Sequence, residues 1–145
     1  MTVPKISVRN LQRKISVNVA ELERFSKYAV QHSLQLPKRR RTDLRKLSEI
    51  FIGLISDRRM ALLHRKFLGQ SGPTDVMTFQ HGEIFISVDT ARRHAHAFEN
   101  SLLRELKLYI AHGLLHLHGF DDETPSESHK MKAAQEKILR NCCAL

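Results

Sequence analysis

The sequence predicts an α+β fold in which a small mixed four-stranded sheet is covered by helices. The first observation is a set of four short segments with the residue patterns of β-strands, all before residue 89. The second is the largely helical pattern of the chain from Asp89 onward. The third is a helix that begins at Asn100 or Ser101, whose apolar face is broad enough to indicate burial against the sheet.

The four predicted strands differ in their patterns. Lys5–Gln12 alternates apolar and polar residues, as expected of a strand with one buried face. Leu47–Ile55 is a continuous apolar run, which is typical of a central strand. Val76–Phe79 and Glu83–Val88 flank a His-Gly turn, and this spacing predicts a β-hairpin. Asp75, just before the hairpin, is expected to accept hydrogen bonds from backbone amides of the turn.

Capping residues mark the starts of the other predicted helices, because their side chains can accept from backbone N–H groups of the first turn. These are Asn18 before a helix to Ser33, Ser56 or Asp57 before one through Phe67, Asp89 before one through Phe98, and Thr124 before one to about Asn141. The last helix is expected to pack through Met131, Ala134 and Ile138, with Gln135 as a weaker candidate.

A metal site is predicted at the end of the broad-faced helix. His112 and His116 are four residues apart, so their Cβ atoms lie about 5–6 Å apart on one helix face, a span that one metal ion can bridge. Gly119 is suited to end the helix in a left-handed turn. Asp122 follows where the reversing chain can return its carboxylate to the imidazoles. We therefore expect His112, His116 and Asp122 to be the metal ligands.

Two other interpretations of this stretch remain open. Its spacing is that of the metzincin zinc motif, with Asp122 in the last ligand position, but Gly113 stands where a metallopeptidase has its catalytic Glu. The two histidines could also be unrelated residues of an ordinary helix. Gly113 costs that helix about 1 kcal/mol relative to Ala, which is expected if another part of the chain passes close by.

The composition fits one globular domain, and we expect residues 1–145 to form a single domain. Of the 145 residues, 41% are hydrophobic and 27% are charged. No apolar run is long enough to span a membrane, and no signal-peptide segment stands at the N-terminus. Adjacent Cys142 and Cys143 cannot join distant parts of the fold, which favours a reduced, cytoplasmic compartment.

The chain carries 24 Lys and Arg against 15 Asp and Glu, a formal net charge of +9. An excess of this size suggests a polyanionic partner, most simply nucleic acid, although a soluble basic protein without such a partner is the alternative. The run at residues 38–41 is either a phosphate-contacting loop or a solvated charged loop.

Three motifs resemble those of the YbeY family. They are Pro-Thr-Asp-Val-Met-Thr-Phe at residues 73–79, Gly-Glu-Ile at 82–84, and His-Gly-Leu-Leu-His-Leu at 112–117 followed by Gly119-Phe120-Asp121. The likeness extends from the first predicted strand to the last predicted helix.

The resemblance implies a zinc-dependent, single-strand-specific endoribonuclease that acts in ribosomal RNA maturation and ribosome biogenesis. It implies a mixed four-stranded sheet, one zinc ion per chain on the late helix, and the Pro-Thr-Asp segment as a wall of the active-site cleft. The implied partners are precursor ribosomal RNA and ribosomal proteins or the small subunit, in the cytoplasm.

The sequence departs from the family pattern at three positions. Asp122 stands where the family has a third His, and it is still a suitable zinc ligand. Leu68 stands where the family usually carries an Arg implicated in activity, so a cation that could stabilise a phosphorane is missing. His64 replaces a usual Asn. Arg65 and Lys66 are neighbouring candidates to supply the missing charge.

The missing Arg keeps a non-enzymatic alternative open, a ribosome-associated RNA-binding protein with a structural metal. A structural site is usually closed by four protein ligands. His118 is the obvious fourth, but it follows His116 by two positions and is expected on another helix face, partly exposed. His94 and His96 are expected on a helix surface, and His129 in solvent. No general acid or base can be assigned from the sequence.

Overall fold

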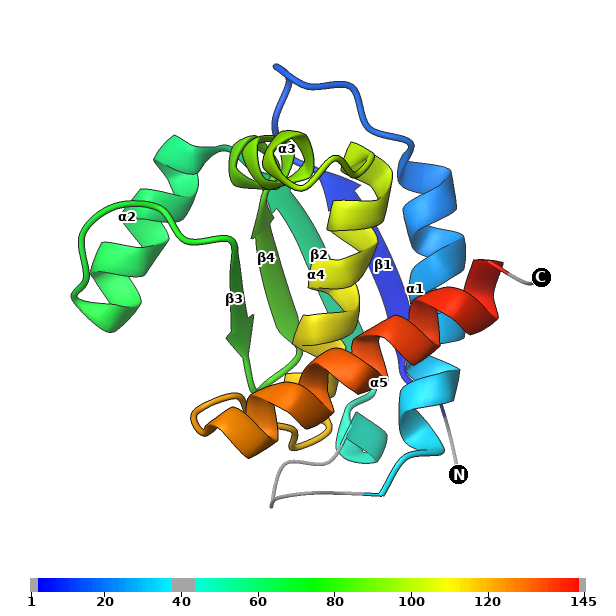
Figure 1. Cartoon of the computed structure of the whole chain (residues 1–145). Coiled ribbons are helices and arrows are strands. Elements are labelled where there is room, and N and C mark those ends of the chain that lie inside the picture. The colour runs from blue at the N-terminus through cyan, green and yellow to red at the C-terminus, as the bar shows by residue number, and fades with distance from the viewer. Residues whose placement is uncertain (1–2, 38–43, 144–145) are drawn as a thin grey trace.

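The computed structural model describes residues 3–37 and 44–143. In chain order its elements are β1 (Lys5–Asn10), α1 (Val19–Leu34), the 3-10 turn η1 (Leu44–Lys46), β2 (Glu49–Ile55), α2 (Asp57–Leu68), β3 (Val76–Phe79), β4 (Glu83–Ser87), α3 (Val88–Ala97), α4 (Leu102–Leu117) and α5 (Pro125–Cys143) (Figure 1). The basic run at residues 38–41 lies outside the described residues.

The predicted mixed, four-stranded sheet is confirmed. Its strand order is β1-β2-β4-β3, with β1, β2 and β4 parallel and β3 antiparallel to β4. The predicted hairpin is β3–β4, in which Phe79 pairs with Glu83. In β1 the side chains of Ile6 and Val8 are buried and their neighbours are exposed, as the alternation predicts. The apolar run forms the inner strand β2, where Ile52 is fully buried.

Helices cover the two faces of the sheet unequally. Figure 1 shows α1 and α4 lying across one face, with α5 packed outside them, and this side holds the main core. On the other face, α2 contributes Met60 to a small cluster with Ile55 and Met77. The rings of Phe79 and Phe85 are only partly buried beside that cluster. This second face of the sheet is therefore thinly covered. Within residues 3–37 and 44–143, no helix has the length and apolar character needed to cross a membrane.

Side chains cap the helices nearly as the sequence predicts. Asn18, Ser56, Ser101 and Thr124 each accept a hydrogen bond from a backbone N–H in the first turn of the following helix. The prediction that Asp89 caps α3 is wrong. The chain turns from β4 directly into α3, so Ser87 is the N-cap.

Asp89 lies within the first turn of α3, where its carboxylate accepts from the backbone N–H of Asp57 at 2.8 Å. The Asp57 carboxylate in turn accepts from Ser87, Thr90 and Arg93. Burial alone would raise the pKa of Asp57, but these hydrogen bonds outweigh it and lower the pKa. This network joins the start of α2 to the start of α3.

Gly113 marks the closest approach of α4 to the sheet. A Cβ atom added there would lie 2.9 Å from both Cδ1 and Cγ2 of Ile84 in β4. Ile84 is fully buried, so it has little room to move away. The expectation that another part of the chain passes close to Gly113 is confirmed, and it explains a glycine inside a helix.

We predict that Gly113→Ala lowers the free energy of unfolding by about 1 kcal/mol, because overpacking against Ile84 outweighs the gain in helix propensity. In an Ile84→Ala background, the same substitution should instead stabilise the protein by up to about 1 kcal/mol, because the opposing side chain is gone. Urea unfolding of the wild type, both single variants and the double variant measures the coupling. An equal effect of Gly113→Ala in both backgrounds would contradict the contact.

Candidate metal centre

A tight reversal of the chain follows α4. Gly119 has φ 95°, in the left-handed region. Its N–H donates to the carbonyl of His116, and the N–H of Phe120 donates to the carbonyl of Leu115. These two bonds form a Schellman motif, which satisfies carbonyls that the helix end would otherwise leave unpaired. The reversal that Gly119 predicts is thus present, and it brings Asp122 back alongside the helix.

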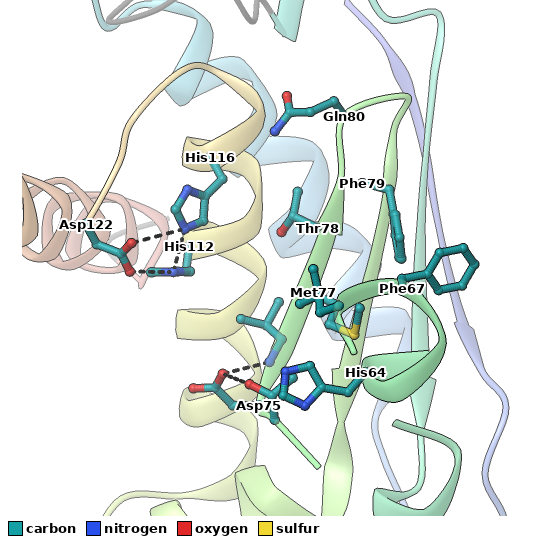
Figure 2. A pocket seen from close by; sticks show the side chains of 13 residues that line it. His64, Phe67, Asp75, Met77, Thr78, Phe79, Gln80, His112, His116 and Asp122 are labelled. Carbon is teal, nitrogen blue, oxygen red and sulfur yellow. Dashed lines mark hydrogen bonds and ion pairs between the residues drawn. The ribbon is translucent and has the colours of Figure 1, made fainter. Parts of the chain in front are cut away.

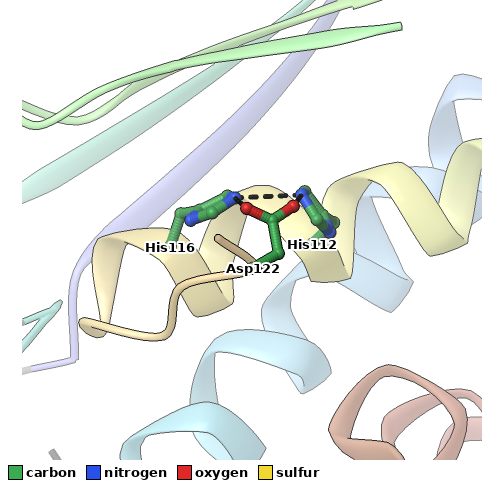
Figure 3. Close-up of side chains that lie close together, drawn as sticks. All are labelled: His112, His116 and Asp122. Atoms are coloured by element: carbon green, nitrogen blue, oxygen red, sulfur yellow. Dashed lines mark hydrogen bonds and ion pairs between the residues drawn. The ribbon is translucent and has the colours of Figure 1, made fainter. Parts of the chain in front are cut away.

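The three predicted ligand side chains meet in space. Figure 3 shows the carboxylate of Asp122 between the rings of His112 and His116. The Nε2 atoms of the histidines are 2.9 Å apart, and the carboxylate oxygens lie 3.5 Å from His112 Nε2 and 3.9 Å from His116 Nε2. The potential ligand atoms all lie within 4.8 Å of one another.

Hydrogen bonds on the far side of each ring fix which nitrogen faces the site. His116 Nδ1 lies 3.0 Å from the carbonyl oxygen of Phe120, which can only accept, so Nδ1 carries the proton in the neutral ring. His112 Nδ1 lies 2.8 Å from Oε1 of Gln135 in α5. Both Nε2 atoms therefore present lone pairs to the centre, as metal-ligating histidines do when a carbonyl or carboxylate holds the other nitrogen.

These residues fit a divalent metal ion. Metal–nitrogen bonds of about 2.0–2.1 Å in tetrahedral geometry place ligand atoms about 3.3 Å apart, close to the observed separations. Two lone pairs and a carboxylate facing one another repel, and a cation relieves that repulsion. Burial lowers the pKa of His116, and the nearby His112 lowers it further, which favours the neutral imidazole that binds metal.

The contact between Gln135 and His112 was not predicted. The sequence places Gln135 only as a weak packing candidate of the last helix, next to Ala134. A signal was present, since an amide on the packed side of a helix needs a hydrogen-bond partner. The identity of the partner depends on how α5 crosses α4, which the local sequence does not specify.

The centre opens into a cleft of about 660 Å³ between α4, β3 and α2 (Figure 2). Residues of the Pro-Thr-Asp motif form its opposite wall, as the resemblance implies. The lining side chains include His64, Phe67, Leu68, Asp75, Met77, Thr78, Phe79 and Gln80 besides the three at the centre. A second cavity of about 200 Å³ lies on the α5 side and includes Lys132, Ser128 and Gln135. Both cavities include His112 and Asp122 in their walls.

Two of the three positions that depart from the family pattern, His64 and Leu68, lie on α2. Leu68 lines the cleft and is 58% exposed, so it brings an apolar side chain to the cleft wall. His64 lies 2.9 Å through Nδ1 from the carbonyl of Gly72, which ties α2 to the following loop. Arg65 and Lys66 are exposed and are not part of the cleft wall.

The other histidines do not join the centre. His118 was expected to be partly exposed, and this is wrong, since it is fully buried with Nε2 2.7 Å from the carbonyl of Leu36. The chain after α1 folds over the end of α4 and covers it. His94 contacts the hydroxyl of Tyr109, and His129 is exposed as predicted.

Asp75 has the structural role that the sequence predicts. Its carboxylate accepts from the N–H of Val76 at 2.8 Å, at the start of the hairpin.

Comparison with known proteins gives one consistent result. The family model described as "Endoribonuclease YbeY" matches residues 7–142. A protein of that name from an Anaeromyxobacter species is 37% identical over 103 residues, covering 64% of this chain and 54% of the relative, so the chain spans about half the length of that relative. Its namesake from Thermus thermophilus is 35% identical over 123 residues, covering 72% of this chain and 88% of the relative. The solution structure of a Thermotoga maritima protein shares the fold, with a TM-score of 0.59, 23% identity, and coverage of 96% of this chain and 92% of that one.

We predict that the metal-free protein loses stability as the pH falls through about 6.5, the pKa of an imidazole in the unfolded chain. The lowered pKa of His116 means that the unfolded chain binds the proton more readily, so acidification favours unfolding until the folded group is also protonated. Burial lowers the pKa of His32 in the same direction. Urea unfolding in the presence of a chelator, at several pH values, measures the effect.

His116→Gln should reduce this pH dependence, because one of the two groups is removed. The exposed His129 provides the matched control, and His129→Gln should leave the pH dependence unchanged. The same dependence in His116→Gln as in the wild type would contradict the assignment.

Proposed function

The chain belongs to the YbeY family, and from this premise we propose that it is a zinc-dependent endoribonuclease, a single domain that cleaves single-stranded RNA during ribosomal RNA maturation. The observation that carries the proposal is the arrangement of His112, His116 and Asp122 beside an open cleft. Two imidazoles and one carboxylate are a usual ligand set of catalytic zinc, which keeps a further coordination position open. When bound, zinc supplies a Lewis acid that activates water and stabilises charge on a phosphodiester.

The protein's own groups hold this arrangement before any substrate arrives. Gln135 and the carbonyl of Phe120 orient the two imidazoles, so each ring keeps its lone pair toward the cleft. The cleft beside the centre has a volume of about 660 Å³, and the net charge of +9 attracts a polyanion. In this proposal the partners are precursor ribosomal RNA and ribosomal proteins or the small subunit, in the cytoplasm.

Lys132 is our candidate for the cation that Leu68 does not provide. It lines the smaller cavity next to His112 and Asp122, on the opposite side from α2. Its side chain is exposed and forms no ion pair with the other residues that the structure describes. An ammonium group there can neutralise the charge of a phosphate held at the centre.

Two rival functions are less well supported. A metallopeptidase would need its general base at Gly113, where even a Cβ atom would meet Ile84 of the sheet rather than enter the cleft. A purely structural metal is usually held by four protein ligands. Over residues 3–37 and 44–143, the group able to hold a metal has three members, and His118 is bonded to Leu36 instead.

We predict that Asp122→Asn weakens zinc binding, by about tenfold or more, whereas Asp121→Asn retains it. The Asp121 carboxylate accepts from the backbone N–H of Asp122, and Asn keeps that acceptor, so the pair is matched in shape and position. Gln135→Leu should weaken zinc about 10- to 100-fold by freeing the ring of His112. Competition with a chromophoric chelator gives the affinities. Zinc loss in Asp121→Asn but not in Asp122→Asn would make Asp121 the ligand.

A second prediction tests the substrate. Unstructured RNA should be cleaved with purified zinc-loaded protein, a chelator should abolish cleavage, and readded zinc should restore it, while casein stays intact. RNA affinity is measured on Asp122→Asn, the variant with weakened zinc binding. This affinity should fall more than about tenfold between 50 and 200 mM salt, because phosphate contacts release counterions. Casein cleavage by the zinc-loaded protein, or RNA affinity independent of salt, would contradict the nuclease proposal.

A further inference from the structure

An exposed aromatic cluster stands at the α2 side of the cleft. Phe67, near the end of α2, is 52% exposed and lies 5.1 Å from Phe79 of β3 between ring centroids. Phe79 also lies 5.9 Å from the ring of His81 and 6.0 Å from that of Phe85. Phe67 and Phe79 both line the cleft that contains His112 and Asp122. We call Phe67, Phe79 and His81 the aromatic rim.

The geometry of the rim leaves a ring face free for a ligand. The planes of Phe67 and Phe79 meet at 75°, so the two rings do not stack and Phe79 cannot cover both faces of Phe67. The ammonium of Lys66 lies 5.4 Å from the centroid of Phe67, but its side chain is exposed and can turn away. A half-exposed phenylalanine beside a cation is the combination that binds a base and its phosphate.

Phe67 and Phe79 line the same cleft as the metal centre, and Figure 2 shows their rings on the other side of β3 from the two histidines. Because β3 is the edge strand of the sheet, an RNA strand whose phosphodiester reaches His112 and Asp122 can pass over β3 and bring a neighbouring nucleotide to Phe67. Arg65 and Lys66 precede Phe67 on α2 and lie outside the cleft, where they can meet the next phosphates.

We propose that the aromatic rim, through Phe67, stacks an unpaired base that flanks the cleaved phosphodiester of single-stranded RNA. This inference rests on the proposed function, since it takes the metal centre as the place of cleavage. It gives a physical reason for single-strand preference. Bases in a duplex are already stacked within the helix, whereas an unpaired base can turn its face onto Phe67.

The test compares two substitutions at Phe67. Phe67→Leu keeps an apolar side chain but removes the aromatic face, and Phe67→Trp enlarges that face. Phe98→Leu is the matched control, since Phe98 is 69% exposed at the end of α3 and does not line the cleft. Fluorescence anisotropy in the presence of a chelator measures affinity for a short single-stranded RNA and for the same strand with an abasic site at each position in turn.

Phe67→Leu should bind the intact strand about tenfold more weakly than the wild type does. Phe67→Trp should bind it as tightly as the wild type or more tightly, and Phe98→Leu should bind it like the wild type. For one of the abasic strands, the wild type and Phe67→Leu should have equal affinities, because the base that stacks on Phe67 is missing from that strand. Equal binding of the intact strand by Phe67→Leu and the wild type would overturn the proposal and leave the rim free for a protein partner. The proposal would also be overturned if Phe67→Leu lost the same affinity, relative to the wild type, for every abasic strand, because the effect of the substitution would then not depend on a base.

Binding without metal separates this proposal from the proposed function. If the wild type binds RNA with the expected dependence on Phe67 but does not cleave it with zinc, the rim stands and the nuclease proposal fails. If the wild type cleaves RNA and Phe67→Leu binds normally, the rim alone fails. Absence of single-stranded RNA binding by the wild type would overturn both.

Discussion

The packing of α4 against β4 at Gly113 is the constraint on which the site depends. Because the backbone of α4 lies directly on Ile84, the helix cannot rotate or shift without a clash or a cavity. Helical periodicity then determines where the neighbouring side chains point. With Gly113 and Leu117 held in the core, His112 and His116 project from the side of the helix toward the cleft. The glycine that excludes a peptidase base thus also positions the two imidazoles.

A second constraint acts through the chain reversal after α4. The Schellman motif at Gly119 directs the chain back along the helix, and the same turn delivers both the carbonyl of Phe120 and the carboxylate of Asp122. One local conformation therefore supplies one candidate ligand and the group that orients another. A polar centre of this kind is compatible with the neighbouring core because the Nδ1 atom of each histidine has a defined hydrogen-bond partner.

The meeting of the three candidate ligand side chains could be predicted from the sequence because its geometry is local. His112, His116, Gly119 and Asp122 lie within eleven consecutive residues, and helix periodicity with one left-handed residue determines their relative positions. Strands, hairpin and most caps were predicted for the same reason. The N-cap of α3 was misplaced because Ser87 and Asp89 are both good capping residues, and only the end of β4 decides between them.

Contacts between distant segments could not be predicted in this way. His118 is buried because the chain at Leu36 folds over the end of α4, and nothing near His118 in the sequence indicates this contact. The support of His112 by Gln135 depends on how α5 crosses α4. The exposed face of Phe67 is likewise a property of the tertiary structure, since a phenylalanine near a helix end is ordinarily expected to be buried.

The two sides of the cleft differ in how firmly they are held. The α4 side is part of the main core, and around the histidines Leu114 and Leu115 are fully buried. The α2 side packs on the sheet through a much smaller cluster centred on Met60. A reacting phosphate needs ligands held to fractions of an ångström, which a well-packed helix provides. A base of varying identity needs only a flat apolar surface, which a lightly anchored helix can provide while adjusting to different nucleotides. If the proposed function is correct, the unequal packing of the sheet's two faces suits a cleft that fixes the phosphodiester and tolerates different sequences around it.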